Sequence, residues 1–395
     1  MPTYSPTEGV SYPLPTPIRY CRRCVMPNTR PGLEIGEDGV CDACKRYEAR
    51  QSIDWAERWL EFSRIVQRYH RRAAGYDCIV TVSSGKDSWH QVKTMLGLGL
   101  TPLLLSVDNL SWTDVGRRNA ERMSDRFNCD LLRLELPRGV ARTLLRKAFH
   151  RLLAPCWYWD RAVYSWPLQM SAKLKIPLVI YGENIGWEYG GVGAQDTLSA
   201  ETQAGNGVVL PVPVEEWIGD GVEPRHFIAH QSPASLRMAG VRPIYLSWAA
   251  PWDGYDHYQA ALADGWQDLR SEGEEGWERQ GLAEQYDQID TVGYGVHPWL
   301  KFVKFGHQHQ SDILSQYVRS GRMKRSEAVK RVLATEHILD GRMLADFLAF
   351  TGITPSEFWS TIDLWANRRM LRQVEGRWRL TPESMDALKE GGVVG

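Results

Sequence analysis

The residue types best suited to phosphate chemistry stand together directly after an apolar stretch at 78–82. They are Ser83, Ser84, Gly85, Lys86, Asp87 and Ser88. A helical pattern starts at about Ser88, so backbone N–H groups and the helix dipole would attract an anion there. Small residues let a phosphate approach, Ser83 and Ser88 can donate hydrogen bonds, and Lys86 supplies charge. The run predicts a phosphate-binding loop rather than an ordinary capped turn, although its spacing differs from the Walker A pattern.

The aspartate in this run predicts a magnesium ion. A carboxylate next to a phosphate is repulsive unless a cation lies between the two groups. Oxygen ligands of this kind are those that Mg²⁺ prefers. We therefore assign Asp87 to Mg²⁺.

A second constellation consists of four cysteines in two pairs, Cys21-x2-Cys24 and Cys41-x2-Cys44. Two such turns can complete a tetrahedron of thiolates around one ion, so the spacing predicts a structural zinc site with no open position. The turn-rich residues between the pairs favour a zinc-ribbon hairpin. The alternative is four reduced cysteines without a metal.

The remaining cysteines, Cys78, Cys129 and Cys156, are isolated. An odd total in a chain of this kind argues against a disulfide framework. Among these three, Cys156 in the stretch APCWYWD is the candidate for a reactive thiol.

Alternating strands and helices must position the phosphate loop. Strands are expected at 77–82, 101–108, 130–136 and 176–182, with helices between them. This alternation predicts an α/β fold with a parallel, doubly wound sheet. Ligands bind beyond the carboxyl ends of such strands. The polar residues at those ends are Asp108, Asn109, Gly182, Glu183 and Asn184.

The composition changes along the chain and predicts five parts. They are a flexible leader (1–18), a zinc ribbon (19–50), the sheet domain (51–200), an irregular segment covering the substrate (201–285) and a helical C-terminal region (286–395). The 395 residues carry 47 basic and 48 acidic side chains, a net charge of −1, which disfavours a nucleic-acid binder. We expect a cytoplasmic protein, because no apolar run approaches the ~18 residues of a membrane span and no signal peptide is apparent.

The run SSGKDS resembles the SGGxDS signature of PP-loop ATP pyrophosphatases. Members of that group cleave ATP between the α and β phosphates and adenylate a carbonyl or amide oxygen. Ser84 stands where the signature has a glycine, and a positive φ at that position would strain a serine.

From about residue 19 to 380 the chain resembles the N-acetyl sugar amidotransferase family. The resemblance is carried by YCRRCVMPNTRPGLEIGEDGVCDAC, the SSGKDS loop, IPLVIYGENIGWEYGG, HPWLKFVKFG and RSGRMKRSEAVKRV. It implies ATP-dependent conversion of an acetamido group on a sugar to an acetamidino group during surface-polysaccharide assembly. It also implies ammonia from separate glutaminase and channel subunits.

The resemblance gives roles to individual residues. Lys86 and the loop amides would stabilise the departing pyrophosphate, and Asp108 and Asn109 would lie at the adenosine. The residues after the later strand would bind Mg²⁺, orient the amide or accept a proton from ammonia. They are Gly182, Glu183, Asn184 and Glu188. The alternative for Glu183 and Glu188 is a pair of solvated loop acids.

The C-terminal half holds basic residues that could bind the phosphates of a nucleotide-linked sugar. They are Lys301, Lys304, Arg319, Arg322, Lys324 and Arg325. Solvated helix faces explain them equally well. His297, His307 and His309 could transfer protons, and we expect no second metal site at them because no cysteine or acid stands at a recognisable spacing.

Two other functions compete with a sugar amidotransferase. Some PP-loop enzymes with a zinc ribbon sulfurate tRNA, but a dithiol relay would need a second cysteine near Cys156, and Trp159 stands there. The balanced charge also disfavours a tRNA surface. The third possibility is a zinc-ribbon scaffold whose ATP site is inactive.

Overall fold

The computed structural model describes residues 14–70, 75–191, 195–203, 210–230 and 240–394, together with the backbone of β1 (Thr3–Ser5) and β2 (Gly9–Ser11). These two strands pair antiparallel. The rest of the predicted leader before residue 14, and parts of the predicted segment 201–285, lie outside the described residues.

Five parallel strands form the central sheet, in the order β5-β4-β3-β6-β7. Their bounds are Cys78–Thr81 (β3), Pro102–Asp108 (β4), Leu131–Glu135 (β5), Leu178–Tyr181 (β6) and Arg242–Tyr245 (β7). The predicted parallel α/β sheet is therefore confirmed. The edge strand β7 was not predicted, because it comes from the segment expected to be irregular.

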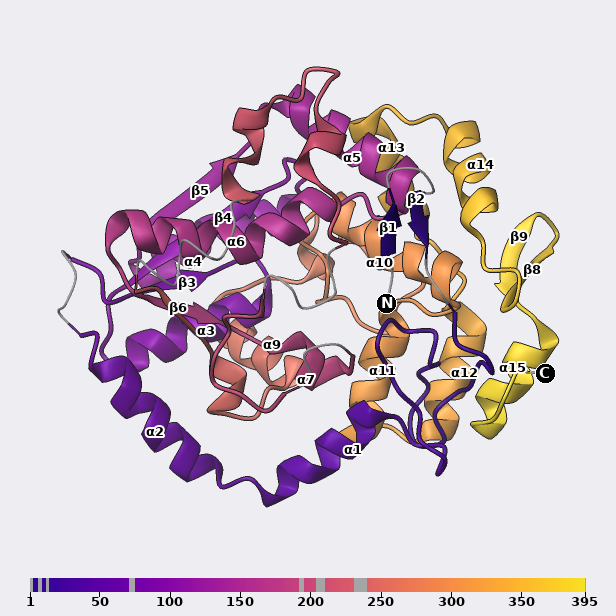
Figure 1. Cartoon of the computed structure of the whole chain (residues 1–395), viewed down its shortest axis with the longest axis horizontal. Coiled ribbons are helices and arrows are strands. Elements are labelled where there is room, and N and C mark those ends of the chain that lie inside the picture. The colour runs from indigo at the N-terminus through magenta and orange to yellow at the C-terminus, as the bar shows by residue number, and fades with distance from the viewer. Residues whose placement is uncertain are drawn as a thin grey trace.

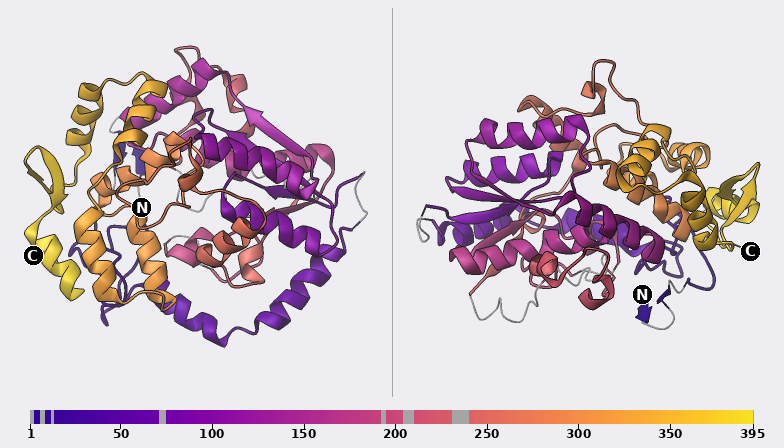
Figure 2. Two further views of the ribbon diagram at one scale, coloured as in Figure 1. Left: turned by 180° about the vertical axis from the view of Figure 1, so that it is seen from behind. Right: turned by 90° about the horizontal axis from the view of Figure 1, so that it is seen from above.

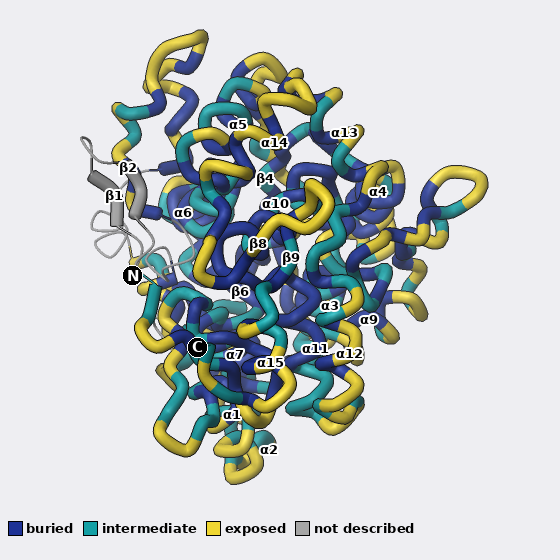
Figure 3. Tube along the Cα trace, turned by 90° about the vertical axis from the view of Figure 1, so that its right-hand side faces the viewer, coloured by how far each residue is buried: buried dark blue, intermediate teal, exposed yellow. Residues whose placement is uncertain are grey.

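Helices cover both faces of the sheet (Figure 2, right). They are α3 (Lys86–Gly97), α4 (Asp114–Phe127), α5 (Arg138–Leu152) and α6 (Trp157–Leu174). Alternate side chains of β3 enter different cores: Cys78 and Val80 pack in the cluster that includes α3 and α4, and Ile79 packs in the cluster with α6. Such two-sided burial explains why β4 and β6 are apolar and buried along most of their length (Figure 3).

The strand order places a topological switch point beside β3. From β3 the chain proceeds outward to β4 and β5, and then returns to form β6 on the other side of β3. Parallel sheets of this kind have a crevice at the carboxyl ends of the strands where the order reverses. The residues that follow β3 are those of the predicted phosphate loop.

Helix α2 (Trp55–Gln67) joins the cysteine-rich segment to the sheet (Figure 1). It begins where the Asp54 side chain accepts a hydrogen bond from the N–H of Glu57. The cysteine-rich segment continues into α1 (Asp42–Ala49). Between its cysteine pairs it has isolated bridges such as Ile35–Cys41, where a hairpin was expected.

The C-terminal part is helical and ends near the cysteine-rich segment (Figure 1). Its elements are α10 (Val292–Phe305), α11 (His309–Arg319), α12 (Arg325–Thr335), α13 (Gly341–Thr351), α14 (Pro355–Trp365), the hairpin β8 (Leu371–Val374) and β9 (Arg377–Leu380), and α15 (Pro382–Glu390). Two shorter helices precede it, α7 (Ile185–Tyr189) and α9 (Gly254–Ala263). In the described part of the chain, no helix combines the length and the apolar character needed to cross a membrane.

Candidate functional site

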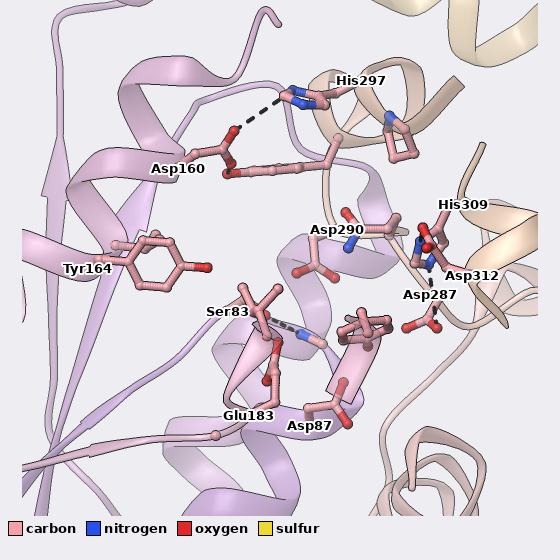
Figure 4. A pocket seen from close by; sticks show the side chains of 18 of the residues that line it. Ser83, Asp87, Asp160, Tyr164, Glu183, Asp287, Asp290, His297, His309 and Asp312 are labelled. Carbon is pink, nitrogen blue, oxygen red and sulfur yellow. Dashed lines mark hydrogen bonds and ion pairs between the residues drawn. The ribbon is translucent and has the colours of Figure 1, made fainter. Parts of the chain in front are cut away.

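A cavity of about 540 Å³ lies beyond the carboxyl ends of β3, β4 and β6. The phosphate loop forms one end of it, and α6, α10 and α11 form the opposite walls (Figure 4). Arg30 and Pro31 of the cysteine-rich segment also line it. Its volume is that of an ordinary small-molecule pocket. The sheet, the cysteine-rich segment and the C-terminal helical region thus meet at this cavity.

The loop is shaped by its own serines. The N–H of Ser83 donates to Ser88 Oγ (2.8 Å), and the N–H of Gly85 donates to Ser83 Oγ (3.0 Å). Helix α3 starts at Lys86, two residues earlier than expected, with Gly85 as its N-cap. All of the predicted loop residues except Ser84 line the cavity.

Ser84 is fully buried and points away from the cavity lining. Its carbonyl accepts a hydrogen bond from Trp266 Nε1 (2.8 Å). Ser84 does not adopt a positive φ. A positive φ would have strained this serine, and the structure does not require one at this position.

Lys86 and Asp87 belong to a buried chain of charges. Lys86 is 3% exposed, and its Nζ contacts Asp87 Oδ2 (2.8 Å) and Asp287 Oδ1 (2.5 Å). Asp87 Oδ1 lies 2.7 Å from His257 Nδ1. Burial alone would lower the pKa of Lys86, but Asp287 and Asp87 hold it well above its usual value. The loop therefore presents a permanently charged lysine to the cavity.

Three carboxylates lie around the loop, although their oxygens are not all within 4.8 Å of one another. Asp87, Glu183 and Asp290 all line the cavity (Figure 4). Burial, with Asp87 as a second cause, raises the pKa of Glu183 to about 7. Burial also raises the pKa of Asp290. Carboxylate oxygens are the ligands that Mg²⁺ prefers, and the two oxygens of Asp87 contact Lys86 and His257. A Mg²⁺ site at Asp87 therefore stays a prediction.

The opposite end of the cavity holds a second group of buried ionisable side chains. Tyr294 Oη donates to Asp160 Oδ1 (2.6 Å), and His297 Nδ1 lies 3.9 Å from Asp160 Oδ2. Burial raises the pKa of Asp160 to about 7. Burial, together with the charge of Lys301, lowers the pKa of Lys304 to about 7. Both groups are poised to change charge near neutral pH.

A buried ion cluster joins the ribbon to the helical region. Asp312 pairs with Arg30 and with Lys301, whose Nζ lies 2.6 Å from Asp312 Oδ2. Arg30 was not recognised from the sequence, because a single arginine in a turn-rich loop carries no signal. Lys301 and Lys304 both line the cavity, as a substrate-binding role requires. His307 also lines it and stacks on Phe305.

Two of the residues at the strand ends, Asp108 and Asn184, have structural roles. Asp108 accepts hydrogen bonds from Trp112 Nε1 (2.8 Å) and the N–H of Leu110 (2.6 Å). Asn184 caps α7 by accepting from the N–H of Trp187. Neither residue lines the cavity, in contrast to Asn109.

Gly182 lines the cavity and has little room for a side chain. A Cβ there would come within 2.7 Å of the Trp252 ring and 2.8 Å of Gln91 Nε2. This position at the end of β6 therefore requires glycine.

Glu188 and Arg319 lie apart from the cavity, in a small neighbouring pocket that Arg50 also lines. Glu188 pairs there with Arg50 at 2.6 Å. Because its carboxylate forms an ion pair away from the loop, the structure gives no support to a catalytic role for Glu188. Arg319 likewise does not reach the main cavity.

Other basic residues of the C-terminal half have structural partners. Arg322 pairs with Asp253 and Asp256 on and before α9. Arg325 donates to the carbonyls of Cys21 and Cys24 and so ties α12 to the cysteine cluster. Lys324 is the N-cap of α12.

The four cysteines Cys21, Cys24, Cys41 and Cys44 come together as predicted, with their sulfurs within 4.8 Å of one another. All four are buried, and Cys24 Sγ lies 3.7 Å from Cys41 Sγ. That separation matches the edge of a tetrahedron with Zn–S bonds of about 2.3 Å. N–H groups of Arg23, Cys24 and Cys41 point at Cys21 Sγ. The cluster is therefore fit to hold a zinc ion.

Residues 280–383 match the model of a family described as LPS biosynthesis protein WbpG-like, C-terminal domain. The match covers the wall of the cavity formed by α10, α11 and the segment before them. It suggests a role in polysaccharide biosynthesis, as part of a sugar-modifying enzyme. A search of curated proteins finds no match to the chain.

Proposed function

We propose that this chain is an AMP-forming, ATP-dependent amidotransferase of the PP-loop type that converts the acetamido group of an N-acetyl sugar to an acetamidino group. The observation that carries the proposal is one cavity with two unlike ends. The phosphate loop lies at one end, and residues of the polysaccharide-biosynthesis family match form a wall from Asp287 beside the loop to Lys304 at the far end. ATP and a sugar can therefore meet in the same space.

The loop end is suited to the first step. The acetamido oxygen attacks the α-phosphorus of ATP, an O–P bond forms, and the bond to pyrophosphate breaks. Lys86 and the N–H groups at the start of α3 bind the departing pyrophosphate. Asp87 and Asp290 would hold Mg²⁺ beside the loop, and the ion would supply neutralisation of phosphate charge there.

The second step replaces AMP by ammonia. Ammonia attacks the imidate carbon, the C–O bond to AMP breaks, and the nitrogen loses a proton. Glu183, buried beside the loop with a pKa of about 7, is placed to accept that proton. At the far end Asp160, Tyr294 and Lys304 bind the sugar portion, because hydroxyl and phosphate groups need buried polar partners.

The direct test incubates the purified chain with ATP, Mg²⁺, ammonium and a panel of acetamido sugars and nucleotide-linked acetamido sugars. AMP and pyrophosphate should appear in equal amounts, and only with a suitable sugar. Formation of ADP, or absence of turnover with every sugar of the panel, would contradict the proposal.

We further propose that ammonia reaches the cavity from separate glutaminase and channel subunits in the cytoplasm. The chain alone should then use ammonium but not glutamine. Adding the two partner subunits should make glutamine a substrate. Turnover of glutamine by the chain alone would contradict this arrangement.

The structure disfavours the competing tRNA thiolation. Cys156 is fully buried, and burial raises the pKa of its thiol well above the usual value. A sulfur-relay cysteine needs an accessible thiolate. Cys156 instead packs in the core beside α6.

The cysteine cluster is proposed to bind structural zinc. Metal analysis of the purified chain should find about one zinc per chain at this site, because all four ligands are protein thiolates. Cys41→Ser should lose both the zinc and the folded state. Normal folding of that variant with less than half an equivalent of zinc in the wild type would contradict the assignment.

A further inference from the structure

Glu284, Asp287 and His309 converge at the edge of the cavity, next to Lys86. Their ligand atoms, two carboxylate oxygens and an imidazole nitrogen, lie within 4.8 Å of one another. Asp287 and Glu284 precede α10, and His309 begins α11. Asp287 and His309 line the cavity (Figure 4), and Glu284 is buried and does not line it.

Glu284 is the most informative member of this group. It is 7% exposed, and neither of its carboxylate oxygens has a hydrogen-bond partner among the residues that the structure describes. Burying a carboxylate without a partner is costly, and buried charges are ordinarily paired or bind metals. A cation at this point would satisfy both oxygens.

His309 has the orientation of a metal ligand. Its Nδ1 lies 3.7 Å from Asp312 Oδ2, and its Nε2 lies 3.6 Å from Asp287 Oδ2. Nε2 is buried and has no hydrogen-bond partner in the described part of the chain. Metal-binding histidines characteristically direct the second ring nitrogen at a carboxylate, which fixes the ring. Asp312 has that position, and Arg30 and Lys301 hold it in place.

The neighbouring protein cations do not bond to Glu284. Lys86 Nζ contacts Asp287 Oδ1, which leaves Oδ2 facing His309. The Nη1 and Nη2 atoms of Arg279 donate to the carbonyls of Gln288 and Asp287, and its buried Nε, like the Glu284 oxygens, has no hydrogen-bond partner among the described residues. Neither side chain therefore satisfies the Glu284 carboxylate.

We propose that Glu284, Asp287 and His309 bind a divalent transition-metal ion of the Mn²⁺ or Zn²⁺ class. Imidazole combined with carboxylates suits these ions, whereas Mg²⁺ prefers oxygen ligands alone. The cavity side of the ion stays open for water or a ligand oxygen. This site is distinct from the cysteine cluster, and its occupancy does not depend on the amidotransferase reaction.

The test uses the full-length chain with its cysteine-bound metal, dialysed into metal-free buffer without ATP. Titration with Mn²⁺, followed by the EPR signal of the free ion, should show one saturable site per chain. Glu284→Gln should weaken this binding by about a hundredfold or more, since even outer-shell changes cost about 10–100-fold. The control is Glu278→Gln, an exposed acid on the same segment, which should bind as the wild type does.

Two further measurements distinguish loss of a metal site from a folding defect in the variant. Mn²⁺ should raise the melting temperature of the wild type and not of Glu284→Gln, whose melting temperature without metal should equal or exceed that of the wild type. Nitrogen coupling in the spectrum of bound Mn²⁺ should disappear in His309→Gln. The proposal is overturned if the wild type shows no saturable binding, if Glu284→Gln binds Mn²⁺ normally, or if equimolar Mg²⁺ displaces it.

Discussion

The two ends of the cavity differ in how their charges are arranged. At the loop end, Lys86 is held between Asp87 and Asp287, and the lysine keeps its charge. At the far end, Asp160 and Lys304 are buried with pKa values shifted to about 7. The first arrangement suits fixed stabilisation of phosphate, and the second suits groups that adjust to an incoming polar substrate.

This contrast predicts that changes at the two ends have different kinetic consequences. Under the proposed function, loop-end groups would act on charge that develops in the transition state, so their loss should lower kcat. Far-end groups would hold the sugar in both ground and transition states, so their loss should raise KM. The following variants test that division.

Asp87→Asn should have the largest effect. We expect kcat for AMP formation to fall about 10²–10³-fold, because the carboxylate that contacts Lys86 and is the proposed ligand of Mg²⁺ is lost. Steady-state AMP release with saturating ATP measures this. Asp125→Asn, an exposed change on α4, is the control, and the cysteine-bound metal should be unaffected. Near-normal AMP release by Asp87→Asn would refute the role of this carboxylate.

Glu183→Gln should lower kcat about a hundredfold if Glu183 is the general base. The base must be ionised, so kcat of the wild type should fall as pH drops below the Glu183 pKa of about 7. When kcat is measured over a series of pH values, the variant should not show this fall at low pH. Glu121→Gln, exposed on α4, should retain it. If Glu183→Gln keeps the same pH profile, another group is the base.

Asp160→Asn should raise KM for the sugar about tenfold or more and change kcat little, because a hydrogen bond to a charged group contributes about 1.5–3 kcal/mol. Initial rates against sugar concentration separate the two constants. A fall in kcat with unchanged KM would place Asp160 in the chemical step. It would contradict the proposed division between loop-end groups that affect kcat and far-end groups that affect KM.

The same variant should change how stability depends on pH. Burial raises the pKa of Asp160 to about 7, so the wild type loses free energy of unfolding as pH rises from about 4 to about 7, and no further above that. Asparagine does not ionise. The melting temperature of Asp160→Asn relative to the wild type should therefore increase between pH 5 and pH 7.5. If the difference in melting temperature between the variant and the wild type is the same at pH 5 and pH 7.5, the pKa of Asp160 is not raised.

Cys156→Ser should have the smallest effect, with kcat and KM within about twofold of the wild type, because a buried thiol of raised pKa takes no part in amide activation. A folded Cys156→Ser protein without activity would revive tRNA thiolation.

Several features of the fold and site could be predicted because they depend on neighbours in the chain. The alternation of apolar strands and helices predicted β3, β4 and β6, since burial on both faces leaves continuous apolar runs, and it also predicted the more exposed edge strand β5. The strand β7 escaped prediction because it lies within the segment 201–285, which was expected to be irregular. The sequence left open whether Ser84 would be strained, and its φ in the structure is not positive.

The sequence by itself determined two local groups, the predicted phosphate loop and the two cysteine pairs. Within the loop, and within each pair, the residues lie only a few positions apart. Backbone geometry over one turn is sufficient to aim their groups at one ligand. Only the tertiary structure decided which distant groups complete the site. Asp287 is 201 residues from Lys86 and His257 is 170 from Asp87, and no local pattern encodes such contacts.

The histidines show most clearly that residues brought together only by the fold leave no local pattern in the sequence. The sequence predicted no second metal site at the histidines, because no set of ligands with a recognisable spacing was found there. In the fold, Glu284 and Asp287 reach His309 from the segment before α10. Metal ligands need proximity in space, and helix packing supplies it without leaving a pattern in the sequence.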